Sequence, residues 1–285
     1  MKAAPTPRSV LISGCSSGIG HHCAHALAAR GWRVFAGARR AEDVERLAGE
    51  RLEALALDLA DSASIEQAVE RVLEATGGRL DALFNNAGYG QPGAVEDVSR
   101  EALRAQFETN LFGAHELTAR VLPAMRRQGS GRVVNHSSVL GLVALPYRGA
   151  YNASKFALEG LTDTLRLELH GTGIQVSLID TGPVRSRFRE NALAMFQRHI
   201  DVEASAHREV YRAVLARLEA SGDAPFTLGP EAVARALVHV LESRRARPRY
   251  YVTAPSRVFA LLRRLLPTWA LDALLRAASA SERRR

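Results

Sequence analysis

The sequence predicts an α/β fold in which a doubly wound, seven-stranded parallel sheet carries helices on both faces, with a helical extension at the C-terminus. Two observations lead to this prediction. Short runs of β-branched and other apolar residues alternate with longer segments of helical period, and glycines follow most of the helical segments. With 285 residues the chain can bury a full core in one domain. We expect that domain over residues 1–255, followed by a tail over residues 256–285.

Seven short apolar runs are expected to form the strands of the sheet. They cover residues 9–13, 33–38, 53–57, 80–85, 132–137, 175–180 and 250–253. The expected helices cover residues 18–30, 41–48, 62–76, 99–127 and 151–170. Ligands of open parallel sheets bind at the carboxyl ends of the strands, so functional residues are expected there.

The regular alternation stops between residues 183 and 228, in an insertion of helical character with several large apolar residues. We expect this insertion and the apolar segment 139–146 to cover a substrate pocket. The tail over residues 256–285 is amphipathic, and its leucines and Trp269 are interrupted by arginines. Two interpretations stay open: the tail packs on the body or on a second subunit, or it rests on a membrane with its arginines facing phosphates.

The formal net charge of +8 does not indicate a nucleic-acid-binding protein, because much of the excess lies in the last quarter of the chain without a nucleic-acid motif. Cys15 and Cys23 are too few for a disulfide framework and fit a reducing compartment. The N-terminus lacks the apolar core of a secretory signal, and no apolar run approaches the roughly 20 residues that cross a bilayer. We expect a cytoplasmic protein, membrane-peripheral if the tail binds lipid.

A glycine-rich turn, SGCSSGIG, separates the first expected strand from the first helix. Its glycines permit a tight turn and let the backbone approach a pyrophosphate, while the helix N-terminus supplies unpaired amides and a partial positive charge. The spacing is GxxxGxG, which differs from the GxGxxG fingerprint. We predict that a dinucleotide contacts Gly14, Ser16, Ser17, Gly18, Ile19 and Gly20.

Arg39 and Arg40 follow the second expected strand, at the position where an NAD site places an acidic residue on the ribose 2'-hydroxyl. The next carboxylate is Glu42. A guanidinium can bond a 2'-phosphate in bidentate fashion, whereas a carboxylate would repel it. This pattern favours NADP(H) as the cofactor, with both arginines among its contacts.

Two further strand ends are expected at the same carboxyl edge. Asp58 follows the third strand, where it either meets the adenine edge or caps the next helix. The segment NNAG at residues 85–88 ends the fourth strand. The predicted cofactor contacts therefore also include Asp58, Leu59, Asn86, Ala87 and Gly88.

Lys155 is one of only two lysines in a chain with 38 basic residues. Tyr151 precedes it by four positions, so on a helix the two side chains share a face and converge on one ligand. A free tyrosine has a pKa near ~10, and a nearby ammonium is expected to lower that pKa towards a value useful for proton transfer. The ammonium can also bond ribose hydroxyls, which the planar fork of arginine would do differently.

Two more polar residues are placed to act with this pair. Ser138 lies 13 residues before Tyr151 at the end of the fifth strand, where its hydroxyl can hold a carbonyl oxygen. Ser137 would then face the other side of the strand. Asn110 lies among apolar neighbours, and we interpret it both as an interior amide and as the holder of a water that relays protons to Lys155.

Together these motifs resemble the short-chain dehydrogenase/reductase family over roughly residues 8–255. The resemblance implies a Rossmann-type fold and a catalytic set in which Tyr151 is the general acid/base and Ser138 positions the carbonyl. It also implies that Lys155 lowers the pKa of the tyrosine and binds the nicotinamide ribose, and that Asn110 completes the relay. Within the family, the sequence is similar to bacterial NADP-dependent aldehyde reductases and to retinol and 17β-hydroxysteroid dehydrogenases.

The resemblance extends to the loop after the sixth strand, with one departure. The usual Pro-Gly of the family is replaced by Thr181-Gly182, which frees one backbone torsion and adds a hydrogen-bond donor. The nicotinamide contacts implied there are Gly182, Pro183, Val184 and Ser186. The resemblance also implies a homo-oligomer, a dimer or a tetramer, with the helices at 99–127 and 151–170 as candidate subunit faces.

We therefore expect an NADP(H)-dependent oxidoreductase that transfers hydride to or from the carbonyl or alcohol carbon of a small apolar aldehyde or ketone. One alternative is an oxidative alcohol, hydroxysteroid or retinol dehydrogenase. Alternatives of another class are a non-catalytic NADP-binding sensor and a membrane-surface adaptor that acts through the tail.

Two other signals are not assigned a function. His21, His22 and His25 contain an i, i+4 pair, but the neighbouring sequence offers neither a third ligand nor a carboxylate, so no metal site is expected. Cys15 lies in the glycine-rich turn, where a helix N-terminus could depress its pKa and open a redox role.

Overall fold

The structure, a computed structural model, describes residues 7–50, 52–220 and 222–283. Seven strands form one sheet in the order β3-β2-β1-β4-β5-β6-β7, and every pairing is parallel. The predicted seven-stranded parallel sheet is therefore confirmed. The strands are β1 (Ser9–Ile12), β2 (Arg33–Ala38), β3 (Glu53–Ala56), β4 (Ala82–Asn85), β5 (Gly131–Ser138), β6 (Ile174–Thr181) and β7 (Arg249–Tyr251).

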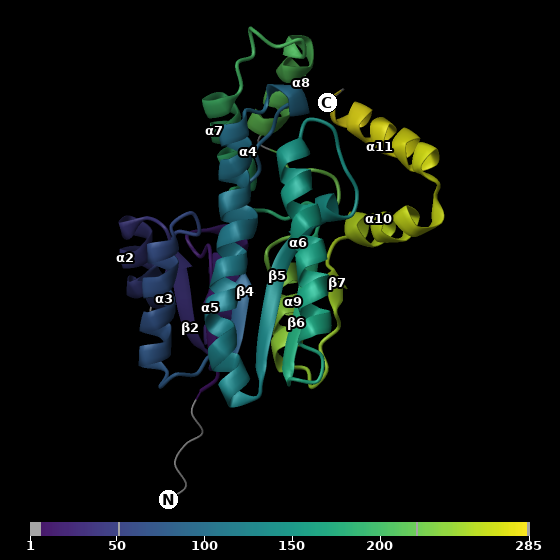
Figure 1. Ribbon diagram of the computed structural model, residues 1–285. Coiled ribbons are helices and arrows are strands. Elements are labelled where there is room, and N and C mark those ends of the chain that lie inside the picture. Colours follow the sequence, from purple (N-terminus) through teal and green to yellow (C-terminus); the bar gives the residue numbers. More distant parts are fainter. Residues whose placement is uncertain (1–6, 51, 221, 284–285) are drawn as a thin grey trace, which may run out of the picture.

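Helices cover both faces of the sheet (Figure 1). Alternate residues of β1 point to opposite faces: Val10 and Ile12 lie in the core with α1 and α9, and Leu11 lies in the core with α3 and α5. One face carries α1 (Gly18–Ala28) and α9 (Glu231–Glu242), and the other carries α3 (Ser62–Ala75), α5 (Gly113–Gln128) and α6 (Gly149–Glu168). The short helix α2 (Ala41–Gly49) connects β2 to β3.

Two helices differ from the sequence-based expectation. The continuous helix expected over residues 99–127 is interrupted, because α4 (Arg100–Phe107) passes into a π-helical turn, η2 (Glu108–Phe112), before α5 begins. Such turns widen the helix locally and concentrate at functional sites, and this one carries Asn110. The apolar period of the sequence continues through the turn, so it does not reveal the widening. Helix α9 was not expected at all, although its one buried face has a clear helical period.

The insertion forms two helices at the carboxyl end of the sheet (Figure 1). They are α7 (Phe188–His199) and α8 (Arg208–Glu219), which pack on each other around the buried rings of Phe196 and Tyr211. The Tyr211 hydroxyl donates to Asp97 in the segment after β4 and accepts a 2.9 Å bond from the backbone N–H of Ala94. A separate small core thus holds the insertion over the strand ends.

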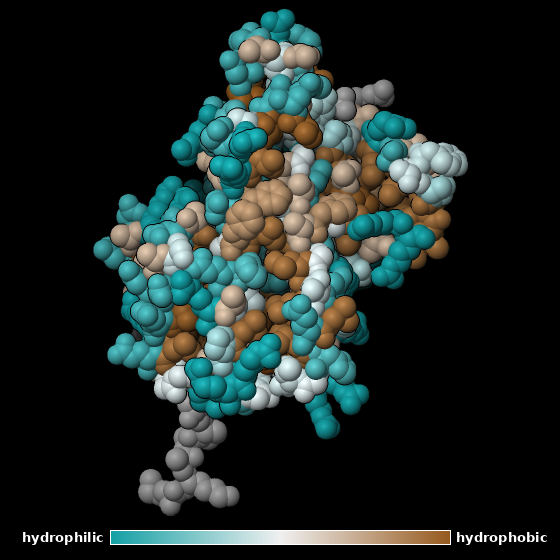
Figure 2. Space-filling model, viewed as in Figure 1, coloured by the Kyte–Doolittle hydropathy of each residue, from teal (hydrophilic) through white to brown (hydrophobic). Residues whose placement is uncertain are grey.

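The tail forms two helices, α10 (Ala254–Leu265) and α11 (Thr268–Arg283), instead of one. Pro267 separates them, because proline cannot donate the backbone hydrogen bond that a continuing helix needs. Helix α11 runs back to α8, where Leu275 and Ser279 are buried (Figure 1). On the outer side, Figure 2 shows apolar side chains gathered over these helices; the exposed ones are Val258, Leu261, Leu265, Trp269 and Leu274.

In the part of the chain that the structure describes, no helix combines the length and the apolar character that crossing a bilayer requires. Cys15 and Cys23 are both buried free thiols, as the absence of a disulfide framework predicted.

Candidate active site

The glycine-rich turn packs directly on the segment that follows β4. Gly14 has a φ of +73°, and a Cβ there would lie 2.8 Å from the Cα of Ala87. A Cβ on Gly20 would lie 2.2 Å from the carbonyl oxygen of Gly14, so both positions require glycine. The side-chain amide of Asn86 donates 3.1 Å bonds to the carbonyls of Ser13 and Gly14. The result is a backbone cradle at the N-terminus of α1, which fits the pyrophosphate of a dinucleotide.

The loop after β6 meets the same turn from the other side. A Cβ on Gly18, whose φ is +59°, would lie 2.9 Å from the Cβ of Ser186. The backbone N–H of Gly182 donates a 2.9 Å bond to the Thr253 hydroxyl. Pro183 and Val184 continue this loop and pair with Leu228 at the end of the insertion. The predicted contacts from β1, β4 and β6 therefore lie side by side at one edge of the sheet.

Ser16, Ser17 and Ile19, the other predicted contacts in the glycine-rich turn, are held by neighbouring elements. Ser17 precedes the first residue of α1 in extended conformation, and Ile19 packs against the core beneath it. The carbonyl oxygen of Ser16 accepts a 2.6 Å bond from the Arg46 guanidinium of α2, so the second helix supports the turn.

Arg39 and Arg40 are exposed at the carboxyl end of β2, where α2 begins. Among the described residues, neither guanidinium forms an ion pair. Both groups are therefore available to an anionic ligand at the edge that carries the glycine-rich turn. The 2'-phosphate contact expected of these two arginines stays a prediction.

Asp58 does not cap the following helix. Its carboxylate accepts a 3.0 Å bond from the backbone of Ala60, whereas Asp61 is the N-cap of α3 and accepts from Ala63. The capping alternative was wrong because the loop continues for three residues before the helix starts. The Leu59 side chain is buried in the core beside α5, so only its backbone can contact a cofactor.

Tyr151 and Lys155 lie one turn apart on α6, with the ammonium nitrogen 5.8 Å from the centre of the phenol ring. Lys155 donates a 2.7 Å bond to the carbonyl oxygen of His136 on β5. The Ser138 hydroxyl is hydrogen-bonded to Tyr151, while the neighbouring Ser137 lies near Asp180 on the other side of the strand. The two serine side chains therefore point to opposite sides of the strand, as expected, and the role of Ser138 in holding a carbonyl stays a prediction.

Burial controls the protonation of both groups on α6. It raises the pKa of Tyr151 to about 12, and the hydrogen bond from Ser138 opposes this rise. Burial lowers the pKa of Lys155 to about 8, against the attraction of Glu159 and Asp180. The expected lowering of the tyrosine pKa by the ammonium does not appear in the protein alone, because Nζ is turned to the His136 carbonyl. At neutral pH the phenol is protonated.

Behind Lys155 lies a partly buried ionic cluster that sequence reasoning missed. Arg249 of β7 bonds Glu159 of α6 and, at 2.6 Å, Asp163 one turn further along. Asp180 of β6 is fully buried, and its burial together with the charge of Glu159 raises its pKa to about 9. The sequence offered one sign of this cluster: Asp180 ends the expected strand QVSLID, where a carboxylate is expected to be buried. This cluster sets the electrostatic surroundings of the lysine.

His136 was also missed. Its ring nitrogens lie 3.1 Å from Asn86 Oδ1 and 3.1 Å from Thr181 Oγ1, so it joins the ends of β4, β5 and β6. Burial and the nearby Lys155 lower its pKa to about 3, which keeps the imidazole neutral. The side-chain hydroxyl of Thr181, which a proline at this position would lack, takes part in this bridge.

Asn110 is buried in the π-helical turn, and its side-chain amide forms hydrogen bonds with Tyr89 and Ser154. Its Oδ1 accepts from the N–H of Tyr89 at 3.1 Å, and its Nδ2 donates to the Tyr89 carbonyl at 2.9 Å and to Ser154 at 3.2 Å. A Cβ on Gly88 would lie 3.1 Å from Oδ1. Asn110 thus ties the segment after β4 to α6, which agrees with the interior-amide interpretation; the proton relay stays a prediction.

The first residue of α7 lies over the phenol. The ring of Phe188 contacts that of Tyr151 edge to face, with centroids 5.3 Å apart. A Cβ on Gly90 would lie 2.8 Å from the same phenylalanine ring. The insertion therefore brings an apolar side chain against the Tyr151 ring.

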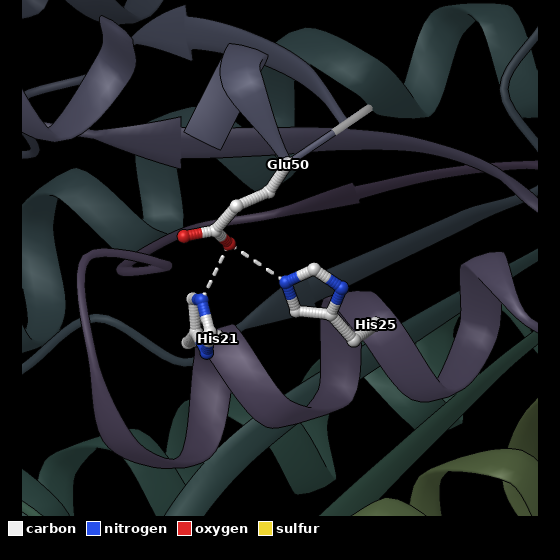
Figure 3. A group of neighbouring side chains, drawn as sticks. All are labelled: His21, His25 and Glu50. Carbon is white, nitrogen blue, oxygen red and sulfur yellow. Dashed lines mark hydrogen bonds and ion pairs between the residues drawn. The ribbon is translucent and has the colours of Figure 1, made fainter. Parts of the chain in front are cut away.

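Two of the unassigned signals are corrected by the structure. Glu50, at the C-terminal end of α2, reaches the His21 and His25 rings at 2.6 and 2.7 Å, so a carboxylate does lie beside the histidine pair (Figure 3). The depressed pKa considered for Cys15 is not found, because burial raises the pKa of that thiol, which donates to the Ile12 carbonyl.

Comparisons with known proteins agree with this geometry. Residues 8–197 match the short chain dehydrogenase family model. The uncharacterized oxidoreductase YbbO of Escherichia coli K12 is 42% identical over 268 residues, covering 94% of each chain. Human 17-beta-hydroxysteroid dehydrogenase type 1 is 36% identical over 267 residues, 89% of this chain and 79% of that protein.

Among solved structures, a short chain dehydrogenase/reductase from Burkholderia phymatum in complex with NAD superposes with a TM-score of 0.74. It is 26% identical, and the match covers 90% of this chain and 92% of that one. The family match covers more than half of the chain and includes the glycine-rich turn and the Ser138, Tyr151 and Lys155 positions. The protein therefore belongs to the short-chain dehydrogenase/reductase family of NAD(P)-dependent oxidoreductases.

Proposed function

We propose that the protein is an NADP(H)-dependent oxidoreductase that reduces the carbonyl group of apolar aldehydes or ketones. One observation carries the proposal: a protonated phenol, a serine hydroxyl and a buried ammonium meet beside the glycine cradle. The same three groups serve both directions of the reaction, and a cellular excess of NADPH favours reduction.

The chemistry divides between the cofactor and the chain. The bound nicotinamide supplies the hydride that the carbonyl carbon receives. Ser138 donates a hydrogen bond to the carbonyl oxygen and holds it beside the phenol. Tyr151 transfers its proton to that oxygen as negative charge develops there, which completes the alcohol. The ammonium of Lys155 then stabilises the phenolate, and Asn110 is proposed to hold the water through which the phenol regains its proton.

The preference for NADP(H) rests on the two exposed arginines at the end of β2. Arg39 and Arg40 would pair with the 2'-phosphate, and the nearest acidic side chain in sequence, Glu42, already lies in the first turn of α2. The cradle residues of the β1, β4 and β6 loops would hold the pyrophosphate and the nicotinamide. Asp58 would meet the adenine.

The proposed substrate is apolar because the groups around the phenol are apolar. Phe188 stands against Tyr151. The segment that follows Ser138 is also apolar, with Leu140, Leu142 and Val143 buried. Similarity to a hydroxysteroid dehydrogenase supports a second candidate, oxidation of a bulky alcohol such as a hydroxysteroid or retinol. The two candidates differ in direction and in the size of the ligand that α7 admits.

We also propose a homo-oligomer that associates through α5 and α6. A groove between these helices is lined by apolar side chains, among them Leu122, Leu161 and Leu165. Phe112, the last residue of η2 before α5, and Phe156 of α6 are also exposed. Light scattering of the purified chain distinguishes a dimer or tetramer from a monomer, and Leu161→Glu is expected to shift it to the monomer.

Peripheral membrane contact through the outer side of α10 and α11 is proposed on the exposed apolar residues named above, which lie near Arg263 and Arg264. Co-sedimentation with vesicles of anionic phospholipid tests it, with Trp269→Ser and Leu265→Ser as the weakened variants. Loss of lipid binding without loss of turnover would separate this contact from catalysis. It would also separate an enzyme from an adaptor.

The experiment that tests the main proposal is an NADPH-oxidation screen across aldehydes, ketones and steroids, with Tyr151→Phe as the blank. We expect turnover by the natural chain on apolar carbonyls and none by the blank. Equal cofactor consumption by both proteins on every compound, with NADPH binding retained, would instead support the non-catalytic sensor. The reverse reaction with NADP+ and the matching alcohols tests the oxidative alternative.

A further inference from the structure

A histidine pair and a carboxylate outside the proposed active site form a compact cluster of metal-ligating groups. His21 and His25 share one face of α1, and Glu50 comes from the C-terminal end of α2 (Figure 3). Both imidazole Nε2 atoms lie against the same carboxylate oxygen, at 2.6 and 2.7 Å. One potential ligand atom from each residue lies within 4.8 Å of the other two.

We propose that His21, His25 and Glu50 form a binding site for a divalent transition-metal ion, with Zn²⁺ as the best match. Two imidazole nitrogens and one carboxylate oxygen are a ligand set that zinc accepts, and they leave a fourth position for water. Ligand atoms about 2.0 to 2.1 Å from a tetrahedral ion are roughly 3.3 Å apart. The observed nitrogen–oxygen separations therefore need to open by less than about 1 Å. The two histidine nitrogens, within 4.8 Å of each other, need to close by at most about 1.5 Å.

The electrostatics of the cluster suit a cation. The Glu50 carboxylate places a negative charge directly beside both imidazole rings. Arg46 bonds the other carboxylate oxygen at 2.8 Å and leaves Oε2 directed at the histidines. Asp43 pairs with Arg46 at 3.1 Å. With neutral imidazoles, the two carboxylates and the one guanidinium leave a net negative charge beside the site.

The site is accessible and lies where a bound ion would restrain the fold. The side chains of His21, His25 and Glu50 are 32%, 41% and 29% exposed, so an ion can enter from solvent. An ion held there would join the first two turns of α1 to the end of α2. Arg46 also donates to the Ser16 carbonyl in the glycine-rich turn, so the joined helices are those that support the proposed cofactor cradle.

The test measures zinc binding to the full chain, with any affinity tag removed and bound metals stripped by chelator. Isothermal titration with ZnSO₄ is compared for the natural chain, His21→Gln, His25→Gln and Glu50→Gln, with His22→Gln as the matched control on the same helix. We expect one ion per chain, and affinity lower by at least about tenfold in each of the three ligand variants but unchanged in the control.

A second readout does not depend on catalysis. At a hundredfold excess of Zn²⁺ over its Kd, the melting temperature of the natural chain is expected to rise by about 5 to 10 °C. Glu50→Gln keeps a side chain that can still hydrogen-bond both histidines, so it tests the ligand without removing the local contact. The proposal is overturned if the natural chain binds no zinc, or if the three ligand variants bind it as tightly as His22→Gln does. The cluster is then a hydrogen-bonded ion pair only.

Discussion

Two pairs of side chains in this protein have the same spacing on a helix and differ in what completes them. Tyr151 and Lys155 on α6 are joined by Ser138, which lies 13 residues before the tyrosine in the same stretch of sequence. His21 and His25 on α1 are joined by Glu50, which lies 25 residues beyond His25 and directly after the last residue of α2. An i, i+4 spacing identifies a shared face in both cases, but only the first pair carries its partner in a recognisable motif.

The two pairs also differ in their electrostatics. The α6 pair is enclosed, so burial moves both of its pKa values away from their usual range: upward for the phenol and downward for the ammonium. The α1 pair is half exposed, and hydrogen bonds lower the pKa of its carboxylate partner, Glu50. We infer that the first site is built to control a proton and the second to hold a cation.

The largest expected effect is on the α6 pair. Tyr151→Phe should lower kcat by about 10² to 10⁴-fold, because it removes the proton donor and keeps the ring against Phe188. Steady-state NADPH oxidation measures this loss, and zinc titration of the same variant should give the natural affinity. A variant that turns over normally would contradict the assignment of the general acid.

A smaller effect is expected at the cofactor phosphate. Arg39→Asp should reduce the preference for NADPH over NADH by about 10 to 100-fold, because it replaces a charge-assisted hydrogen bond with repulsion. The ratio of kcat/KM for the two cofactors measures the change. Arg30→Gln, which alters an exposed arginine paired with Glu242 at the far end of α1, is the control and should leave that ratio unchanged.

The pH profile should report the ammonium of Lys155. Its pKa is lowered to about 8, so the charged form is present below that pH and is lost as the pH rises through it. We expect kcat/KM for reduction to be level up to about pH 8 and to fall roughly tenfold per unit above it. Lys155→Arg, which stays charged, should lose this limb whatever its absolute rate. A reduction rate that increases between pH 8 and 10 would contradict the assignment.

The smallest effect is expected from Arg46, which connects the histidine cluster to the glycine-rich turn. Arg46 bonds both Glu50 and the Ser16 carbonyl of the glycine-rich turn. Arg46→Gln should weaken NADPH binding by about two- to tenfold, the cost of one exposed charge-assisted hydrogen bond. Equilibrium titration followed by NADPH fluorescence measures it, with His22→Gln as the control. An unchanged Kd would show that the hydrogen bond from Arg46 to the turn contributes nothing to NADPH binding.

Much of the fold was predictable because local patterns agree with the tertiary structure. Each predicted strand lies within two residues of the observed one at both ends, since apolar runs between turn residues mark strands buried on both faces. The interruption at Asn110 was not predictable, because a π-helical turn leaves the apolar period nearly unchanged. The break in the tail was foreseeable from Pro267, although its consequence, the return of α11 to α8, was not.

The sequence by itself determined the parallel sheet, the glycine cradle and the set of Tyr151, Lys155 and Ser138. In each case the grouped residues are close in sequence, or they lie at strand ends that a parallel sheet brings to one edge. Only the tertiary structure decided what surrounds them. It placed Asp180, Glu159 and Arg249 behind the lysine, raised the pKa of the phenol through burial, and delivered Glu50 to the histidines. These outcomes depend on packing between elements that are distant along the chain, and residue spacing carries no record of that packing.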